Sequence, residues 1–238
     1  MAEVESSIVV PCFNEAANLS ALIENFRSLA LVQRNIEVLL VNNGSTDETA
    51  AVLEREIRSD DGIRVVNVPS PDVGYGHGIM SGLRAARGRY LAWTHADGQT
   101  PPIDAITGLG LLRTSSDPSR TLVKGRRRGR PIGAQLFTGG MDAAARTLLG
   151  AGFVDVNAQP KCFPRALLSL ATTAPNDLSL DLYFFWLARH HGFGVQTFDV
   201  HFGTRRAGES KWAFNWRSRA RHIERTLRFM NTLRRHGR

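Results

Sequence analysis

The feature that most constrains this chain is the regular alternation of strand-like and helix-like segments in its first half. Short apolar runs rich in β-branched residues, typical of buried strands, occur at residues 7–11, 36–41, 63–68 and 90–93. Segments with apolar residues at helical spacing lie between them, at residues 14–26, 46–57 and 74–88. This alternation predicts an α/β fold with a doubly wound, mostly parallel sheet flanked by helices.

The second half is less regular. Its pattern predicts helices at residues 101–113, 134–149, 164–172 and 178–191, and strands at residues 121–123, 154–156 and 195–200. We expect a basic loop at residues 124–130 and a terminal helix from Trp212 onward. In the first half, Asn14 is a candidate N-cap for the first helix, and Ser45 or Thr46 for the second.

Composition indicates one intracellular domain. The chain has 238 residues, of which 42% are hydrophobic, enough for one substantial core. Only Cys12 and Cys162 are present, which excludes a disulfide framework and fits a reducing compartment. No apolar run reaches the roughly 18 residues of a membrane span, and Met1–Val10 is too short and too acidic for a signal peptide. We therefore expect a soluble cytoplasmic protein.

The positive charge is concentrated in two segments. Eight arginines and one acid lie from Arg217 to the end, so this stretch carries +7 of the formal net charge of +8. Residues 124–130 add five positive charges in seven residues. Such patches favour anionic partners, namely phosphates, lipid headgroups or nucleic acid, although a solvated basic face explains the tail equally well.

An apolar stripe runs along the predicted terminal helix. It is formed by Trp216, Ala220, Ile223, Leu227 and Met230. A helix with one apolar and one basic face can lie in a membrane interface, but it can also pack on its own domain or on a partner helix. Without a spanning segment, membrane contact would be peripheral and sensitive to salt.

Polar residues follow the predicted strands of the first half. Glu15 follows the first strand and Asn43 the second, and both types of side chain can bind a base or ribose. Because ligands bind at the carboxyl ends of parallel strands, this edge of the sheet is the candidate site. The glycine-rich stretch at residues 74–78 lacks dinucleotide or P-loop spacing, so we expect a flexible loop near the site there.

Asp97 and Gln99 offer two oxygen donors from one turn after the fourth predicted strand. Mg²⁺ and Mn²⁺ prefer oxygen ligands and share them with a diphosphate, so this turn is a candidate metal site. The spacing alone is weak evidence, because Asp-Gly turns are common.

Four motifs, in this order, resemble the inverting family 2 glycosyltransferases: Val9–Glu15, Val41–Asp47, Gly76–Gly88 and Ala96–Gln99. The resemblance continues through Asp155–Lys161, Arg165 and Arg205–Lys211, so it covers about residues 6–212. Within that family, the dolichyl-phosphate mannose synthase-like branch, which uses polyprenyl phosphates, is most similar. The resemblance implies a GT-A (Rossmann-like) fold, a nucleotide-sugar donor and a divalent cation, Mg²⁺ or Mn²⁺.

Carried over residue by residue, the resemblance also implies roles for individual side chains. The nucleotide pocket would be formed by Pro11, Phe13, Glu15, Val41 and Asn43. Asp97 and Gln99 would hold the metal, with His95 and Ala96 beside the sugar, ribose or diphosphate. Arg205 and Lys211 would act with Asp97 in catalysis by contacting the diphosphate or the acceptor phosphate. Arg126 and Lys161 would bind substrate, with Arg126 on the acceptor phosphate.

The chain departs from the family pattern twice. Asn42-Asn43 stands where the family usually has Asp-Asp, so the sequence leaves uridine versus guanosine open. His95-Ala-Asp97 stands where the family usually has Asp-x-Asp, which removes one carboxylate from the metal site. His95 is compatible with metal binding, with donation to a sugar or phosphate, or with a structural role.

The expected reaction is inverting transfer of a sugar from a UDP- or GDP-sugar to a polyprenyl phosphate. A phosphate acceptor is already anionic near pH 7 and needs no general base, whereas a hydroxyl acceptor would need one, for which Asp155 is the candidate. The alternatives are the same chemistry on a soluble hydroxyl acceptor and a non-catalytic nucleotide- or RNA-binding module.

We expect residues 1–211 to form the GT-A domain and residues 212–238 a basic amphipathic helix. The expected partners are a nucleotide-sugar donor and a lipid-phosphate or small-molecule acceptor, without nucleic acid. The terminal helix would give peripheral contact with the inner face of the membrane, and a homo-oligomer is left open.

Overall fold

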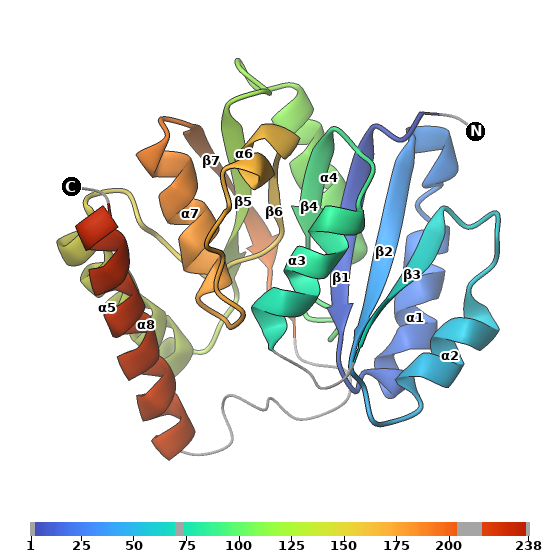
Figure 1. The fold of residues 1–238 in the computed structure, drawn as a ribbon, viewed down its shortest axis with the longest axis horizontal. Coiled ribbons are helices and arrows are strands. Elements are labelled where there is room, and N and C mark those ends of the chain that lie inside the picture. The colour runs from blue at the N-terminus through green and yellow to red at the C-terminus, as the bar shows by residue number, and fades with distance from the viewer. Residues whose placement is uncertain (1–2, 70–73, 204–215, 237–238) are drawn as a thin grey trace.

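A computed structural model describes residues 3–69, 74–203 and 216–236. Within these residues, the strands form one sheet in the order β3-β2-β1-β4-β6-β5-β7 (Figure 1). The strands are β1 (Ser6–Cys12), β2 (Ile36–Asn43), β3 (Ile63–Val68), β4 (Tyr90–Trp93), β5 (Thr121–Arg128), β6 (Lys161–Pro164) and β7 (Gly194–His201). β6 runs antiparallel to β4 and β5, whereas the other strand pairs of this sheet are parallel. The predicted α/β fold with a mostly parallel sheet is confirmed.

Helices cover both faces of the sheet (Figure 1). They are α1 (Ala16–Arg27), α2 (Thr49–Glu56), α3 (Tyr75–Ala85), α4 (Pro102–Arg113), α5 (Ile132–Leu149), α6 (Arg165–Ser169), α7 (Leu180–His190) and α8 (Trp216–His236), with a 3-10 turn at Val32–Arg34. Helices α1, α2 and α4 pack on one face, whereas α3, α5, α6, α7 and α8 contribute to the core on the other.

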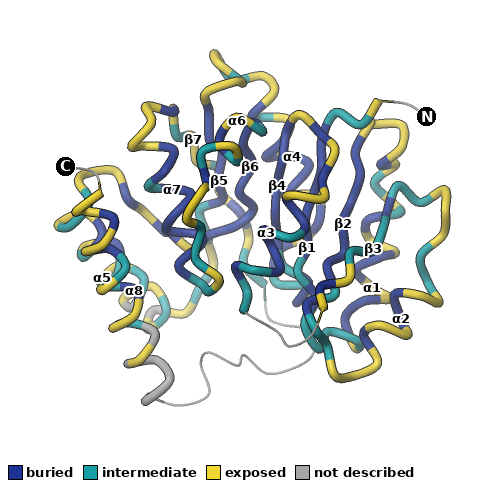
Figure 2. Tube along the Cα trace, viewed as in Figure 1, coloured by how far each residue is buried: buried dark blue, intermediate teal, exposed yellow. Residues whose placement is uncertain are grey.

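Successive residues of the central strands alternate between these two cores. Val9 and Trp93 belong to one core, and Ile8 and Val10 to the other. Because both faces are covered, each strand reads as a continuous apolar run, and Figure 2 shows these strands buried along their length. The Trp93 ring packs edge-on against Phe163 and Phe184, with centroids 5.4 and 5.0 Å apart, which joins β6 and α7 to β4.

Two predictions for the second half are wrong. Residues 154–156 form no strand, and the strand lies further on, at β6, where it pairs with β4. The predicted loop at residues 124–130 begins with a strand, since Lys124–Arg128 are the end of β5. A strand tolerates this density of charge here because acidic residues on neighbouring segments bind the arginines.

The predicted helix caps are also wrong. Asn14 lies before α1 with φ of 55°, and its Oδ1 accepts a hydrogen bond from the Thr46 backbone N–H at 2.8 Å. Asp47 serves both helices, because its carboxylate accepts from the backbone N–H of Ala16 at 3.3 Å and of Thr49 at 3.0 Å. One side chain therefore fixes the starts of α1 and α2 beside the β1 and β2 ends.

The terminal helix packs on its own domain. Met230 and Leu233 are 1% and 4% exposed and belong to the same core as Trp93, and α8 lies beside α5 (Figure 1). Among its side chains that the structure describes, the exposed arginines are Arg221, Arg225, Arg228, Arg234 and Arg235. None of the described helices is long and apolar enough to cross a membrane. Of the three fates predicted for the apolar stripe, its described part adopts packing on its own domain.

Candidate functional site

One edge of the sheet collects the polar residues singled out by the sequence. The carboxyl ends of β1, β2, β4, β5 and β7 meet there, together with the amino end of β6, because β6 runs the opposite way. This edge therefore brings residues from both halves of the chain together, as expected for an α/β sheet.

The β1 and β2 ends hold the predicted nucleotide residues. Pro11 and Phe13 are half-buried, and Glu15 accepts a hydrogen bond from Asn18 Nδ2 at 2.6 Å. Val41 is fully buried, and a Cβ at Gly82 would lie 2.7 Å from its Cγ2, so its side chain belongs to the core beneath α3. Any contact of Val41 with a nucleotide would have to come from its backbone.

Asn43 connects β2 to the start of α3. It is 3% exposed, and its Nδ2 donates to the carbonyl of Gly74 at 3.1 Å. A Cβ at Gly78 would lie only 2.8 Å from Asn43 Cγ, so glycine permits this approach. The first turn of α3 is itself bound, because the backbone N–H groups of Gly76 and His77 donate to the Asn176 carbonyl at 2.8 and 3.3 Å. From Tyr75 onward, the expected flexible loop is helix.

The turn after β4 carries Asp97 and Gln99. The Gln99 backbone N–H donates to Asp97 Oδ1 at 3.1 Å, and Gly98 between them has φ of 74°, which favours glycine. Gln99 Nε2 donates to the Gly203 carbonyl at 3.2 Å, and the Gly203 N–H returns a bond to the Gln99 carbonyl at 2.9 Å. The turn is thereby fastened to the segment that follows β7.

These two residues fit a metal that needs few protein ligands. Gln99 donates to Gly203 from its amide nitrogen, so its side-chain oxygen is the atom that can bind a metal. Asp97 supplies a carboxylate that is 6% exposed. Among the described residues, no group of three or more His, Cys, Asp and Glu side chains converges on a metal position. Such a donor pair suits a hard cation that takes its other ligands from a diphosphate and water.

His95 lies between this turn and a buried polar network. Its ring centroid is 6.2 Å from that of Tyr75, and burial lowers the pKa of His95, which favours a neutral imidazole at pH 7. Ala96, the neighbouring predicted site residue, is 4% exposed.

The network itself is built on Lys161 and Asp181. Lys161 Nζ donates to Asp181 Oδ1 at 2.5 Å and to the carbonyls of Val156 and Ala158 at 2.9 and 3.0 Å. Its side chain is fully buried, and its three N–H donors join Asp181 on α7 to the segment before β6. The Tyr75 hydroxyl bonds the other oxygen of Asp181 at 3.4 Å and accepts from Gln159.

The basic residues at the end of β5 divide into an inner and an outer set. In the inner set, Arg127 donates to Asp155 from its guanidinium and, at 2.8 Å, from its backbone N–H, and Arg130 lies 3.8 Å from the same carboxylate. Burial raises the pKa of Asp155, but Arg127 outweighs it and holds that pKa below its ordinary value. Asp155 is thus an engaged, charged carboxylate rather than a free general base.

The outer set faces solvent. Arg126 and Arg128 have side chains 42% and 56% exposed, and each donates from Nε to a different oxygen of Asp199, at 2.7 and 2.9 Å. The predicted acceptor residue Arg126 is therefore accessible at this edge. The predicted catalytic residues Arg205 and Lys211 lie outside the described residues.

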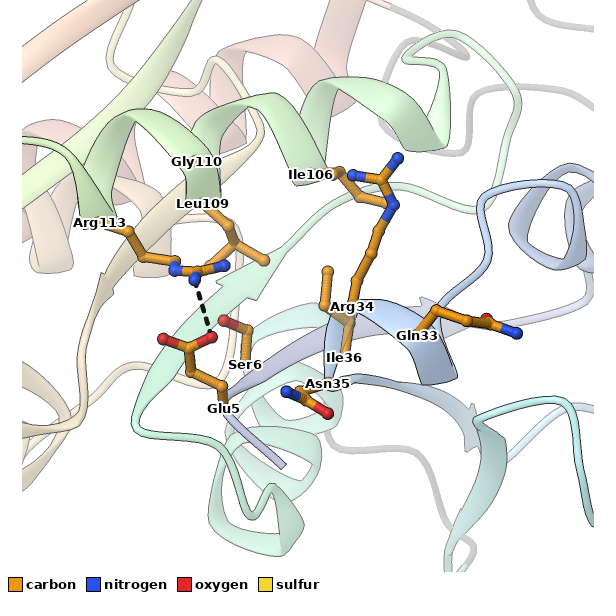
Figure 3. A pocket seen from close by; sticks show the side chains of 10 residues that line it. All are labelled: Glu5, Ser6, Gln33, Arg34, Asn35, Ile36, Ile106, Leu109, Gly110 and Arg113. Atoms are coloured by element: carbon orange, nitrogen blue, oxygen red, sulfur yellow. Dashed lines mark ion pairs between the residues drawn. The ribbon is translucent and has the colours of Figure 1, made fainter. Parts of the chain in front are cut away.

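A cavity of about 340 Å³ lies at the opposite edge of the sheet. It is lined by the starts of β1 and β2 and the end of α4, with an ion pair between Arg113 and Glu5 at 3.0 Å (Figure 3). It contains none of the predicted site residues.

Sequence reasoning missed Tyr75, Gln159, Asp181 and Asp199. Gln159 lies inside the motif at residues 155–161, which was the available signal. Asp181 and Asp199 lie in no motif, and only strand pairing and helix packing bring them to this edge.

The sheet order and the helices on both of its faces define a GT-A, Rossmann-like fold. The sequence profile of Glycosyl transferase family 2 matches residues 7–114. An uncharacterized glycosyltransferase of Mycobacterium tuberculosis is 32% identical over 212 residues, which cover 86% of this chain and 88% of that protein. The chain belongs to glycosyltransferase family 2. This confirms the predicted enzyme class and removes the non-catalytic alternative.

Other similar proteins match in part or in fold. Undecaprenyl-phosphate 4-deoxy-4-formamido-L-arabinose transferase of Proteus mirabilis is 29% identical over 125 residues, covering 52% of this chain and 37% of that enzyme. A crystal structure of glucosyl-3-phosphoglycerate synthase from Mycobacterium tuberculosis, in complex with Mn²⁺, UDP-glucose and phosphoglyceric acid, has a TM-score of 0.74 at 22% identity. It covers 97% of this chain and 81% of that one, and it supports the GT-A fold.

Proposed function

We propose that this glycosyltransferase moves a sugar from a UDP- or GDP-sugar to an acceptor that carries a phosphate monoester, with a polyprenyl phosphate as the first candidate. The observation that carries the proposal is the exposed pair Arg126 and Arg128 at the site edge, beside an Asp155 that is already bound. The partial similarity to an undecaprenyl-phosphate transferase supports the lipid acceptor.

On the donor side, we assign the nucleotide to the β1 and β2 ends, near Glu15 and Asn43, and the diphosphate to the turn of Asp97 and Gln99. Asp97 and Gln99 would hold a divalent cation, Mg²⁺ or Mn²⁺, which supplies charge neutralisation for the departing diphosphate. The Mn²⁺ and UDP-glucose in the structural relative's complex support both assignments. For Arg205 and Lys211, we propose a role in binding the same diphosphate or the acceptor phosphate.

On the acceptor side, a phosphate oxygen would attack C1 of the sugar. The bond from C1 to the diphosphate oxygen breaks, and its electron pair leaves with the nucleoside diphosphate. A phosphate monoester is charged at pH 7, so no proton has to be removed from it. This chemistry fits a site whose one predicted base, Asp155, is held by Arg127 in an ion pair.

A soluble acceptor is the second candidate, because the structural relative's complex contains phosphoglyceric acid. That molecule also carries a phosphate monoester, so the same arginine pair would suit it, but its acceptor group would be a hydroxyl that has to lose a proton. For a lipid acceptor, we propose peripheral contact with an anionic membrane surface through the exposed arginines of α8 rather than through its buried apolar side.

The test is a transfer assay with Mn²⁺ and radiolabelled UDP- and GDP-sugars. Undecaprenyl phosphate in detergent, 3-phosphoglycerate and no acceptor form the three arms. We expect label in the lipid extract in the first arm only. Label on phosphoglycerate alone would select the soluble acceptor, and failure of every donor in every arm, including hydrolysis, would contradict the proposed function.

A further inference from the structure

The outer arginines are held by one carboxylate from the neighbouring strand. Strands β5 and β7 pair in parallel, with Arg126 opposite Asp199 and Arg128 opposite His201. Residues two apart on a strand project from the same face, so both arginine side chains reach Asp199. Its Oδ1 accepts from Arg126 Nε at 2.7 Å and its Oδ2 from Arg128 Nε at 2.9 Å. Asp199 is thus bound on both oxygens.

The way in which Asp199 binds leaves the ends of the arginines available. Both ion pairs use Nε, and the η amino groups of Arg126 and Arg128 make no other hydrogen bond within the described part of the chain. Each guanidinium is a planar fork whose amino groups can bind phosphate oxygens in pairs. Two such forks, fixed by one carboxylate, carry a net charge of +1 and present their free ends at solvent.

The strand ends that carry the pair are joined to the turn proposed to hold the metal and the diphosphate. Residues 200–203 follow Asp199 directly, and Gly203 exchanges two hydrogen bonds with Gln99, in the turn that carries Asp97. The Phe202 backbone N–H also donates to the Arg128 carbonyl at 3.2 Å. The ends of β5 and β7 are thereby tied to the turn proposed for the diphosphate.

We propose that Asp199 is a positioning residue that fixes Arg126 and Arg128 as a preformed receptor for the phosphate monoester of the acceptor. This inference rests on the proposed function for the reaction, but it concerns a binding step that is measured without transfer. The shared chemistry is the phosphate monoester, whether it is attached to a polyprenyl chain or to a small soluble molecule.

Removing Asp199 changes the affinity for phosphate in opposite directions for a positioning role and for a purely electrostatic role. If Asp199 only reduced the positive charge, its removal would strengthen phosphate binding, by about threefold at this exposure. If it positions the arginines, its removal makes binding order two free side chains, which weakens binding by about tenfold. The second effect is larger, so the sign of the change separates the two roles.

The experiment is calorimetric titration of the full-length protein with farnesyl phosphate and, separately, with 3-phosphoglycerate. We expect Asp199→Asn to weaken the binding of at least one of these probes by about tenfold, and Asp199→Glu to restore it to within about threefold. The probe that binds identifies the source of the phosphate. Asp117→Asn is the matched control, because Asp117 is exposed and lies before the other end of β5, and we expect no change in that variant.

In transfer assays, Asp199→Asn should raise the acceptor KM by a similar factor and leave kcat and the donor KM nearly unchanged. Phosphate binding that is equal or tighter in Asp199→Asn would overturn the inference, as would a parent protein that binds neither probe. If the probes bind and Asp199→Asn weakens them but no sugar is transferred, the inference stands and the proposed function fails.

Discussion

The two halves of the chain differ in how they use buried charge. Up to Arg113, the buried charged side chains of the described residues are Glu37 and Asp97. Beyond it, they are Lys124, Asp142, Asp155, Lys161 and Asp181. The first half is a parallel βα unit held mainly by apolar contacts, with Glu37 paired to Arg64 at 2.8 Å. The second half contains the antiparallel β6 and uses ion pairs such as Lys161–Asp181 and Arg127–Asp155 to hold the segments around it.

Because of this difference, we expect charge substitutions in the two halves to affect different properties, the reaction in one half and the stability of the fold in the other. A buried ion pair that loses one partner leaves an uncompensated charge, which costs more than the loss of an exposed pair. Changing charge in the second half should therefore unfold the protein more readily. In the first half, changing the carboxylate at the turn after β4 should affect the reaction first.

The largest expected effect is on activity, in Asp97→Asn. Removing the proposed metal ligand should lower sugar turnover by about a hundredfold to a thousandfold, because charge on the leaving diphosphate loses its stabilisation. We expect the urea unfolding midpoint to change little. Asp60→Asn, at an exposed carboxylate, is the control. Turnover within threefold of the parent would remove Asp97 from the reaction.

The next effect is on stability, in the inner arginine set. Arg127→Met should lower the free energy of unfolding by about 3 kcal/mol, because Asp155 stays buried without its partner. Arg126→Met, at the exposed arginine that precedes Arg127 on β5, should lower it by less than about 1 kcal/mol. Urea denaturation measures both, and equal losses would contradict the division into inner and outer sets.

A smaller loss is expected in α8. Met230→Ala should lower the free energy of unfolding by about 2 kcal/mol, because Met230 is 1% exposed in the core that α8 shares with the sheet. Asn231→Ala, at the exposed neighbouring position, should change it by less than about 0.5 kcal/mol. The same small effect for both would mean that α8 is not part of the folding unit.

The smallest effect is a pH dependence from Lys124. Burial, together with nearby Lys161, lowers the pKa of Lys124 to about 7. Its pKa in the unfolded chain is higher, so between these values the unfolded chain binds more protons and the free energy of unfolding rises with pH. Lys124→Met lacks this contribution, so the parent should gain about 1 kcal/mol relative to the variant between pH 7 and 8. Parallel stability curves would contradict this.

Much of the first half was predictable from sequence. The strands at residues 63–68 and 90–93 have the predicted bounds, because short apolar runs between turn residues are a local signal. Helix caps were not predictable in this way, since Asp47 caps two helices that meet only in the folded chain. In the second half, a strand was predicted at residues 154–156, but the strand of this region is β6, at Lys161–Pro164. The β-branched residues Val154 and Val156 have a strand-like pattern, yet they lie in the segment before β6.

The residues of the candidate site also differ in how far the sequence could predict their place. Sequence reasoning located the edge, through Glu15, Asn43 and Asp97, because those residues follow strands and strand ends are visible as patterns. It assigned Lys161 to substrate binding, and the structure places its ammonium in the interior beside Asp181. Nothing in the local pattern around Lys161 distinguishes an ammonium in a site from one in the interior.

By itself, the sequence determined the α/β class, the polar strand edge and membership of a glycosyltransferase family, because these depend on periodicity and short motifs within single segments. Only the tertiary structure decided which charges are buried, which arginines face solvent and which carboxylate holds them. Those properties depend on partners far away along the chain, such as Asp199 for Arg126 and Asp155 for Arg127, and they exist only once the strands have paired.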